Sequence, residues 1–310
     1  MHRPLHAAHR FCYRIVVMLR ISWVRWILAA LILAGLARAA LVAVRTYRYE
    51  YSVLHWPREV PARPDWPELR DVEFGEGVRG WYAPPANGAV IVYLHGSPSN
   101  RTDQLPLARA LAKAGFGALL FDLPGWGESA GQIDWAEPSR RALAASVRFA
   151  ATQPKVAHLG AVGFSMGSGV LAVEAADDPR VEAMALVGAF TNQRAALVGE
   201  FAKWGPLTRW PARWAAERSG VQIDAPGSID SIARFAPRPL LVIAGTADHT
   251  VPAEDSVKLF EAARQPKRLW LIPGARHGEY EQALGERYAE GLRDFFAGAL
   301  LGHQPVGAAR

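Results

Sequence analysis

A short glycine-bracketed segment, Gly163-Phe164-Ser165-Met166-Gly167, constrains the fold of this chain more than any other feature. The apolar residues 158–162 precede it and are typical of a buried strand, and a helix of small residues is expected over 166–176. The two glycines flank Ser165 because so tight a turn leaves no room for side chains and strains the serine backbone. The sequence therefore predicts a strand, a sharp turn that exposes the Ser165 hydroxyl, and a helix whose N-terminus stabilises negative charge there.

Strands and helices are expected to alternate along most of the remaining chain. Strands are predicted over residues 71–74, 78–82, 89–94, 118–121, 182–187, 240–244 and 268–272, and helices over 102–114, 137–152, 252–263 and 280–296. Gly75-Glu76-Gly77 is expected to join the first two strands as a hairpin, and Asp103 to cap the first of these helices. Continuous apolar strands separated by helices indicate an α/β fold with a mostly parallel, doubly wound sheet.

One stretch, residues 190–235, contains no clear strand and interrupts this alternation. It holds Trp204, Trp210 and Trp214 together with several arginines and prolines. We interpret it as a short helical lid over the functional site. Its tryptophans either bind substrate, by lining an acyl pocket or touching a membrane, or form the buried side of the lid helices.

The basic residues are concentrated at the N-terminus. The whole chain has 35 basic and 29 acidic residues, but eight arginines and no acidic residue fall within residues 1–48. The rest of the chain has 27 basic residues against 29 acidic ones, so no basic face for nucleic acid is expected. Cys12 is the only cysteine, which excludes a disulfide within the chain and a cysteine-based metal site.

An apolar segment, residues 26–44, follows the basic start. Arg38 is its only charged residue, and its length is close to the roughly 20 residues needed to span a bilayer. A single-pass membrane anchor is favoured. The alternative is a signal peptide cleaved near Ala39, at the Ala37-Arg38-Ala39 pattern, which would leave a secreted or periplasmic protein. In both cases the basic start would remain cytoplasmic and the large domain would be exported.

Residues 49–69 are expected to link this N-terminal segment, residues 1–48, to a main domain over residues 70–310. Four prolines fragment the linker, at positions 57, 61, 64 and 67. A spacer of this composition is extended and fairly stiff.

Two loops after predicted strands carry the residue types that would activate a serine. Asp248 follows the strand over 240–244, and His277 follows the strand over 268–272. Functional groups of a doubly wound sheet lie on loops at the carboxyl ends of its strands, so both are candidate partners of Ser165. His249 is a rival to His277, but it adjoins Asp248 on the same turn and cannot easily be oriented by that carboxylate.

With these residues in the order Ser, Asp, His, the chain from about residue 70 onward resembles the α/β-hydrolase superfamily. The motifs that carry the resemblance are the elbow at 163–167, Gly-x-x-Asp-x-x-Val-Pro at 245–252 and Gly-x-x-His at 274–277. The elbow and Asp-Leu-Pro-Gly-Trp-Gly-Glu-Ser at 122–129 are loosely similar to the Bem46-like proteins and the serine aminopeptidase branch. This resemblance implies acyl transfer with no metal or organic cofactor.

The resemblance also assigns roles to single residues. Ser165 would be the nucleophile, His277 the base that takes its proton, and Asp248 the group that fixes the imidazole tautomer. The backbone N–H groups of Met166 and Ser97 would form the oxyanion hole. His95 would brace its loop, and Asp122 and Glu128 would have a structural role near the pocket.

The sequence thus favours a serine hydrolase that cleaves carboxylic esters or thioesters, with a small-molecule acyl substrate and a membrane contact through the N-terminal segment. A peptidase of the aminopeptidase branch and a non-catalytic binding protein with the same fold remain as alternatives. An aspartate at position 165 would instead have indicated cleavage of carbon–halogen bonds or epoxides.

Overall fold

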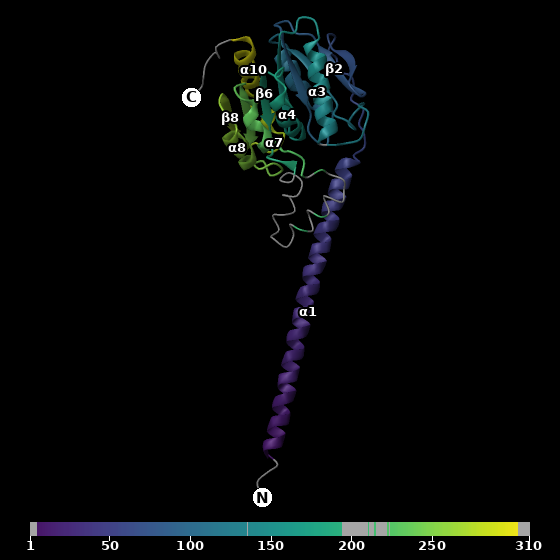
Figure 1. Ribbon diagram of the computed structural model, residues 1–310, viewed down its shortest axis with the longest axis vertical. Helices are drawn as coiled ribbons and strands as arrows, with labels where there is room; N and C mark the ends of the chain where they lie inside the picture. Colours follow the sequence, from purple (N-terminus) through teal and green to yellow (C-terminus); the bar gives the residue numbers. More distant parts are fainter. Residues whose placement is uncertain are drawn as a thin grey trace.

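The computed structural model describes residues 5–134, 136–193 and 224–302, together with residues 210, 214 and 222. In Figure 1 a single long helix, α1 (Leu5–Leu54), extends from a domain built around one sheet. The bounds of the strands are β1 (Arg70–Phe74), β2 (Val78–Ala83), β3 (Ala89–Leu94), β4 (Gly117–Phe121), β5 (His158–Phe164), β6 (Ala183–Val187), β7 (Leu240–Gly245) and β8 (Lys267–Ile272).

The sheet runs in the order β1-β2-β4-β3-β5-β6-β7-β8. Strand β2 is antiparallel to both β1 and β4, and every other neighbouring pair is parallel. The hairpin expected at Gly75-Glu76-Gly77 is present, with both glycines at positive φ. The prediction of a mostly parallel α/β sheet is therefore confirmed.

Helices cover both faces of this sheet. Their bounds are α2 (Leu105–Ala112), α3 (Glu137–Ala151), α4 (Met166–Asp177), α7 (Ser228–Ser231), α8 (Ala253–Ala262), α9 (Tyr280–Leu284) and α10 (Glu286–Leu301), with short 3-10 helices at η1 (Arg101–Gln104) and η2 (Ile232–Phe235). Side chains of β3 alternate between the two resulting cores, one with α3, α4 and α8 and the other with α2 and α10. This is why β3 is apolar at every position.

Two predicted helices differ from those observed. The helix expected over 102–114 begins only at Leu105, after η1, and Asn100 rather than Asp103 caps that first turn by accepting a hydrogen bond from the Thr102 N–H. The helix expected over 280–296 is two helices, because Gly285 adopts φ +60° between α9 and α10. Pro106 lies in the first turn of α2, a position where proline is tolerated, and so marks the first break, whereas no proline marks the second.

Helix α1 continues beyond the predicted N-terminal segment. It ends at Leu54, within the expected linker, because no proline interrupts the chain before Pro57. Its part from Trp23 to Arg45 is long and apolar enough to cross a membrane, with a mean hydropathy of 2.5. Large apolar side chains of this part, such as Leu31 (64% exposed), project into the surroundings rather than into the domain.

Most of the predicted lid, residues 190–235, lies outside the described residues, including Trp204. Trp210 and Trp214 are described, and their exposed fractions are 73% and 43%. Near its end the segment forms α7 and η2, whose Ile232 and Phe235 pack into the core beside α4. The lid as a whole therefore stays a prediction.

Candidate active site

Ser165 occupies a sharp turn between β5 and α4. Its φ is +49°, a left-handed conformation that non-glycine residues rarely adopt, and its N–H donates to the carbonyl oxygen of Val187 (2.9 Å). A Cβ at Gly163 would lie 2.5 Å from the Gly167 carbonyl oxygen, and one at Gly167 would lie 2.7 Å from the His95 carbonyl oxygen. The two glycines are thus required by close backbone approach, and the strained serine turn has the predicted form.

The structure brings Ser165, His277 and Asp248 together from three different loops. His277 Nε2 lies 3.0 Å from Ser165 Oγ, and His277 Nδ1 lies 2.6 Å from Asp248 Oδ2. The Asp248 side chain is fully buried and that of His277 is 17% exposed. This chain of hydrogen bonds fits a neutral imidazole that donates from Nδ1 to the carboxylate and accepts the serine proton at Nε2.

Backbone groups hold the Asp248 carboxylate in place. Its Oδ1 accepts hydrogen bonds from the N–H groups of Thr250 (2.9 Å) and Val251 (2.8 Å), which leaves Oδ2 for His277. The Tyr280 hydroxyl also points at Oδ2, at 3.4 Å. Burial and the adjacent carboxylate raise the pKa of Tyr280, so its phenol stays protonated and acts as a donor.

The oxyanion hole expected at the N–H groups of Met166 and Ser97 stays a prediction, and the positions of α4 and of the loop after β3 bear on it. Met166 is the first residue of α4, so its N–H is among the helix-start groups that have no acceptor within the helix. The loop that carries Ser97 passes beside the nucleophile, because a Cβ at Gly96 would lie 3.5 Å from the Cβ of Ser165. The Asp103 carboxylate accepts a hydrogen bond from the Gly96 N–H (3.2 Å) and so helps to fix this loop.

His95 is fully buried and bonds only to backbone among the described residues. Its Nδ1 lies 2.6 Å from the Gly96 carbonyl oxygen, and its Nε2 accepts a hydrogen bond from the Leu123 N–H (3.0 Å). Burial lowers the pKa of His95 to about 4, since there is no water to solvate an imidazolium. The side chain therefore ties the loop after β3 to the loop after β4.

Asp122 and Glu128 contact a buried arginine rather than Ser165. The Asp122 carboxylate accepts from Arg101 Nη1 (2.7 Å), from the Arg101 N–H (2.8 Å) and from the Glu128 N–H (2.9 Å). Arg101 also pairs with the Glu128 carboxylate, and its guanidinium lies over the Trp81 ring at 4.3 Å. These contacts stabilise the loops after β3 and β4, next to the site.

The structure adds neighbours of the site that sequence reasoning missed. The Phe164 ring packs against His277 at a centroid distance of 4.9 Å, and Tyr280 contacts Asp248. Tyr280 is the first residue of α9 and lies three residues after His277, so its nearness in sequence could have indicated it. Arg101 had no such signal, because its partner Asp122 is far away in sequence. In the part of the chain described, no three His, Cys, Asp or Glu side chains form a group that could hold a metal ion.

Comparison with known proteins gives related chains over most of the sequence. Residues 89–208 match the α/β hydrolase fold family. The chain is 33% identical to the uncharacterized protein MT2364 of Mycobacterium tuberculosis over 250 residues, 76% of this chain and 82% of that one. It is 28% identical to the uncharacterized protein YfhR of Escherichia coli over 268 residues, 82% and 89% of the two chains. An esterase of Pyrococcus furiosus, Pf2001, has the same fold, with a TM-score of 0.64 at 21% identity over 77% of this chain and 96% of that one.

Proposed function

Because the chain belongs to the α/β-hydrolase family, we propose that it is a serine hydrolase that cleaves carboxylic ester or thioester bonds. The observation that carries the proposal is the aligned pair of hydrogen bonds from Ser165 through His277 to Asp248. A protein of the same fold is named an esterase, which is consistent with it.

The reaction begins at Ser165. Its Oγ attacks the carbonyl carbon of the acyl substrate while His277 Nε2 takes the hydroxyl proton. Asp248 stabilises the imidazolium that forms, and it also keeps Nδ1 protonated so that Nε2 is free to act as the base. The bond to the alcohol or thiol then breaks, and the leaving group departs with the proton from His277. Water, deprotonated by the same histidine, releases the acid from the acyl-enzyme.

Negative charge develops on the substrate oxygen in this step. The N–H of Met166 and that of Ser97 are the proposed donors to it, and the N-terminus of α4 adds a favourable field. The strained turn at Ser165 supports this arrangement, because it presents Oγ and the N–H of Met166 to the same space.

The proposal for α1 is that it is retained as a single-pass membrane anchor with the catalytic domain on the exported side. The exposed apolar side chains between Trp23 and Arg45 support it, because they need an apolar surrounding. The intact mass of the protein in isolated membranes tests it: retention of residues 1–38 is expected. A mature chain that begins near Ala39 would contradict the anchor.

The catalytic proposal is tested with p-nitrophenyl esters of increasing chain length and a thioester analogue. The full chain in detergent should release product from at least one of them. Ser165→Ala should lower the rate by roughly 10⁴-fold or more, because it removes the nucleophile. Ser99→Ala is the matched control, since Ser99 lies in the neighbouring loop and donates only weakly to the Asn100 carbonyl oxygen (3.5 Å). Equal rates for Ser165→Ala and the unchanged chain would contradict the proposal.

A further inference from the structure

The segment after α1 is fastened to the same edge of the sheet that carries Ser165. We call residues 55–69 the strap. Arg58 donates to the carbonyl oxygen of Ser129 (3.0 Å) and also to that of Gly131, in the loop after β4. The Asn100 side chain, in the loop after β3, donates to the Glu59 carbonyl oxygen (3.2 Å). Both loops begin at carboxyl ends of strands, where Ser165 also lies after β5.

Further hydrogen bonds hold the rest of the strap. Arg109 of α2 donates to the Asp65 carbonyl oxygen (2.6 Å), and Arg63 donates to that of Leu69 (2.6 Å) and pairs with Asp71. The strap is therefore held against the domain at several points between the end of α1 and the start of β1. Figure 1 shows the result: α1 departs from the end of the domain opposite the C-terminal end of α10.

The height of this edge above a membrane follows from helix geometry. Helix α1 is continuous from its candidate span, Trp23–Arg45, to Leu54. At a rise of about 1.5 Å per residue, its end stands roughly 14 Å beyond Arg45. With α1 spanning a bilayer up to Arg45, the carboxyl edge of the sheet would face that bilayer from a short distance. Exposed apolar side chains lie on the strap at that level, with Trp56 40% and Val60 70% exposed.

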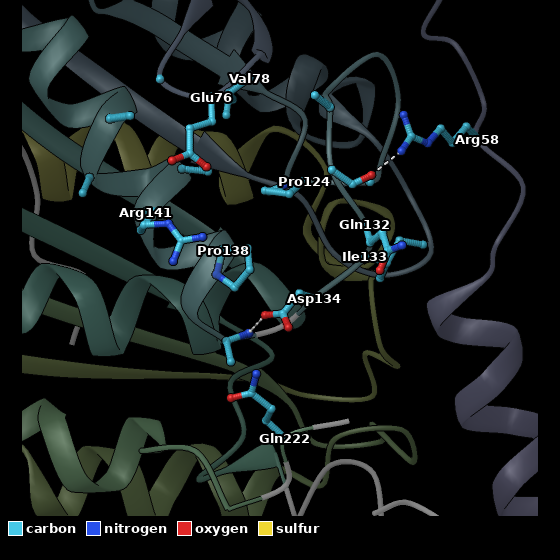
Figure 2. A pocket seen from close by; sticks show the side chains of 18 of the residues that line it. Arg58, Glu76, Val78, Pro124, Gln132, Ile133, Asp134, Pro138, Arg141 and Gln222 are labelled. Carbon is cyan, nitrogen blue, oxygen red and sulfur yellow. Dashed lines mark hydrogen bonds between the residues drawn. The ribbon is translucent and has the colours of Figure 1, made fainter. Parts of the chain in front are cut away.

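A cavity of about 960 Å³ opens between the strap and this edge. His55, Trp56 and Arg58 line it from the side of α1, and Arg141 of α3 lines it from the domain. Figure 2 shows Arg58 on one side and Glu76 and Arg141 on the other. The volume is within the range of pockets that bind small molecules.

A very small cavity, with a volume of about 10 Å³, adjoins this one on the side of the nucleophile. Ala136 and Gln193 line both cavities. The small one also has Met166 and Phe190 in its wall, and Met166 directly follows Ser165. The walls of the two cavities therefore meet at Ala136 and Gln193, and the wall of the small one includes the residue that follows Ser165.

We propose that the protein takes its substrate from the bilayer that holds α1, as the long-chain acyl ester of a membrane lipid, which enters through the large cavity beside His55 and Trp56. This rests on the proposed function, since it needs acyl transfer at Ser165 and a retained α1. Hydrolysis would return the alcohol part of the lipid and release a fatty acid.

The first test compares an embedded ester with a soluble one. The full chain is reconstituted in dioleoylphosphatidylcholine vesicles that contain a minor fraction of monooleoylglycerol, and p-nitrophenyl acetate is added to the water. Release of both oleate and p-nitrophenolate is expected. Turnover of the acetate without oleate release from either lipid would overturn the inference and leave the proposed function standing. Turnover of neither ester would contradict the proposed function, and the inference with it.

A longer α1 tests whether the distance to the bilayer matters. Seven helix-forming residues inserted between Arg48 and Tyr49 add about 10 Å and almost two full turns, so the domain rises with nearly the same orientation. Oleate release should fall at least about tenfold, because lifting the lipid exposes its methylene groups to water. Acetate turnover should be unchanged. The same residues inserted between Gly302 and His303 serve as the control. Unchanged oleate release in the lengthened α1 would overturn the inference.

A measurement without turnover tests the orientation directly. Single cysteines replace Gln132, in the loop beside the cavity, or Thr152, at the opposite edge of the sheet, in a chain with Cys12→Ser. Each is labelled with bimane in vesicles that carry head-group nitroxide lipids. Stronger quenching at position 132 than at 152 is expected. Equal or reversed quenching would overturn the inference, whatever the activity of the insertion variant.

Discussion

Two buried carboxylates lie at the same edge of the sheet, but only one of them is linked to Ser165 by hydrogen bonds. Asp248 follows β7 and shares one oxygen with a partly exposed histidine that reaches Ser165. Asp122 follows β4 and is surrounded by donors from Arg101 and Glu128, with no access to the serine. The histidines differ in the same way, because His277 hydrogen-bonds to a hydroxyl and His95 only to backbone groups of the described residues. Residue type and strand-end position therefore do not by themselves decide which group reacts.

The largest difference between the two carboxylates is expected from the substitution Asp248→Asn. The amide oxygen would keep the bonds from Thr250 and Val251, so its NH₂ would face His277 Nδ1. The imidazole would then carry its proton on Nε2 and could not accept one from Ser165. We expect the ester hydrolysis rate to fall by roughly 10⁴-fold. A rate within tenfold of the unchanged chain would mean that Asp248 does not orient the base.

Asp122→Asn should show the reverse pattern. The amide would direct N–H groups at the donors of Arg101 and leave a buried guanidinium short of its partner. We expect the free energy of unfolding to fall by about 3 kcal/mol, with ester turnover of the folded protein within tenfold. Denaturant unfolding in detergent, followed by tryptophan fluorescence, measures this. Unchanged stability together with lost turnover would place Asp122 in the chemistry instead.

His95 is expected to have a smaller effect, a dependence of the stability of the protein on pH. The pKa of His95 is about 4 in the folded protein against about 6.5 unfolded, so the unfolded chain binds more protons between these values. Stability should therefore fall as the pH drops from 6.5 to 4, by up to about 3 kcal/mol from this residue. His95→Asn, compared by melting temperature across this range, should lose part of the dependence. An identical pH dependence in both proteins would contradict the burial argument.

The reacting residues could be predicted from the sequence for a physical reason. Ser165 directly follows β5, Asp248 and His277 lie in the loops that follow β7 and β8, and parallel strands bring their carboxyl ends to one edge. The pattern of apolar residues predicts the strands, and the parallel order of the strands then places the three side chains near one another. Gly163 and Gly167 marked the turn because no other residue fits there.

The contacts that hold the loops around the site could not be predicted in the same way. The contacts of Arg58 with Ser129 and Gly131 span about seventy residues and depend on the conformation of two irregular loops. Arg101 lies just before the helix predicted over 102–114 and had no predicted role, whereas η1 turns it into the interior beside Asp122. Helix α1 ends at Leu54, inside the predicted linker, because the first residues of that linker contain no proline and continue the helix.

The most direct test of the account is labelling of the full chain by a fluorophosphonate, which reacts only with an activated serine. We predict rapid labelling that is absent in Ser165→Ala, at least about 100-fold slower in His277→Asn, and within tenfold of the unchanged chain in folded His95→Asn. Labelling that persists in Ser165→Ala, or that depends on His95 as strongly as on His277, would contradict the assignment of Ser165 and His277 as the reacting pair.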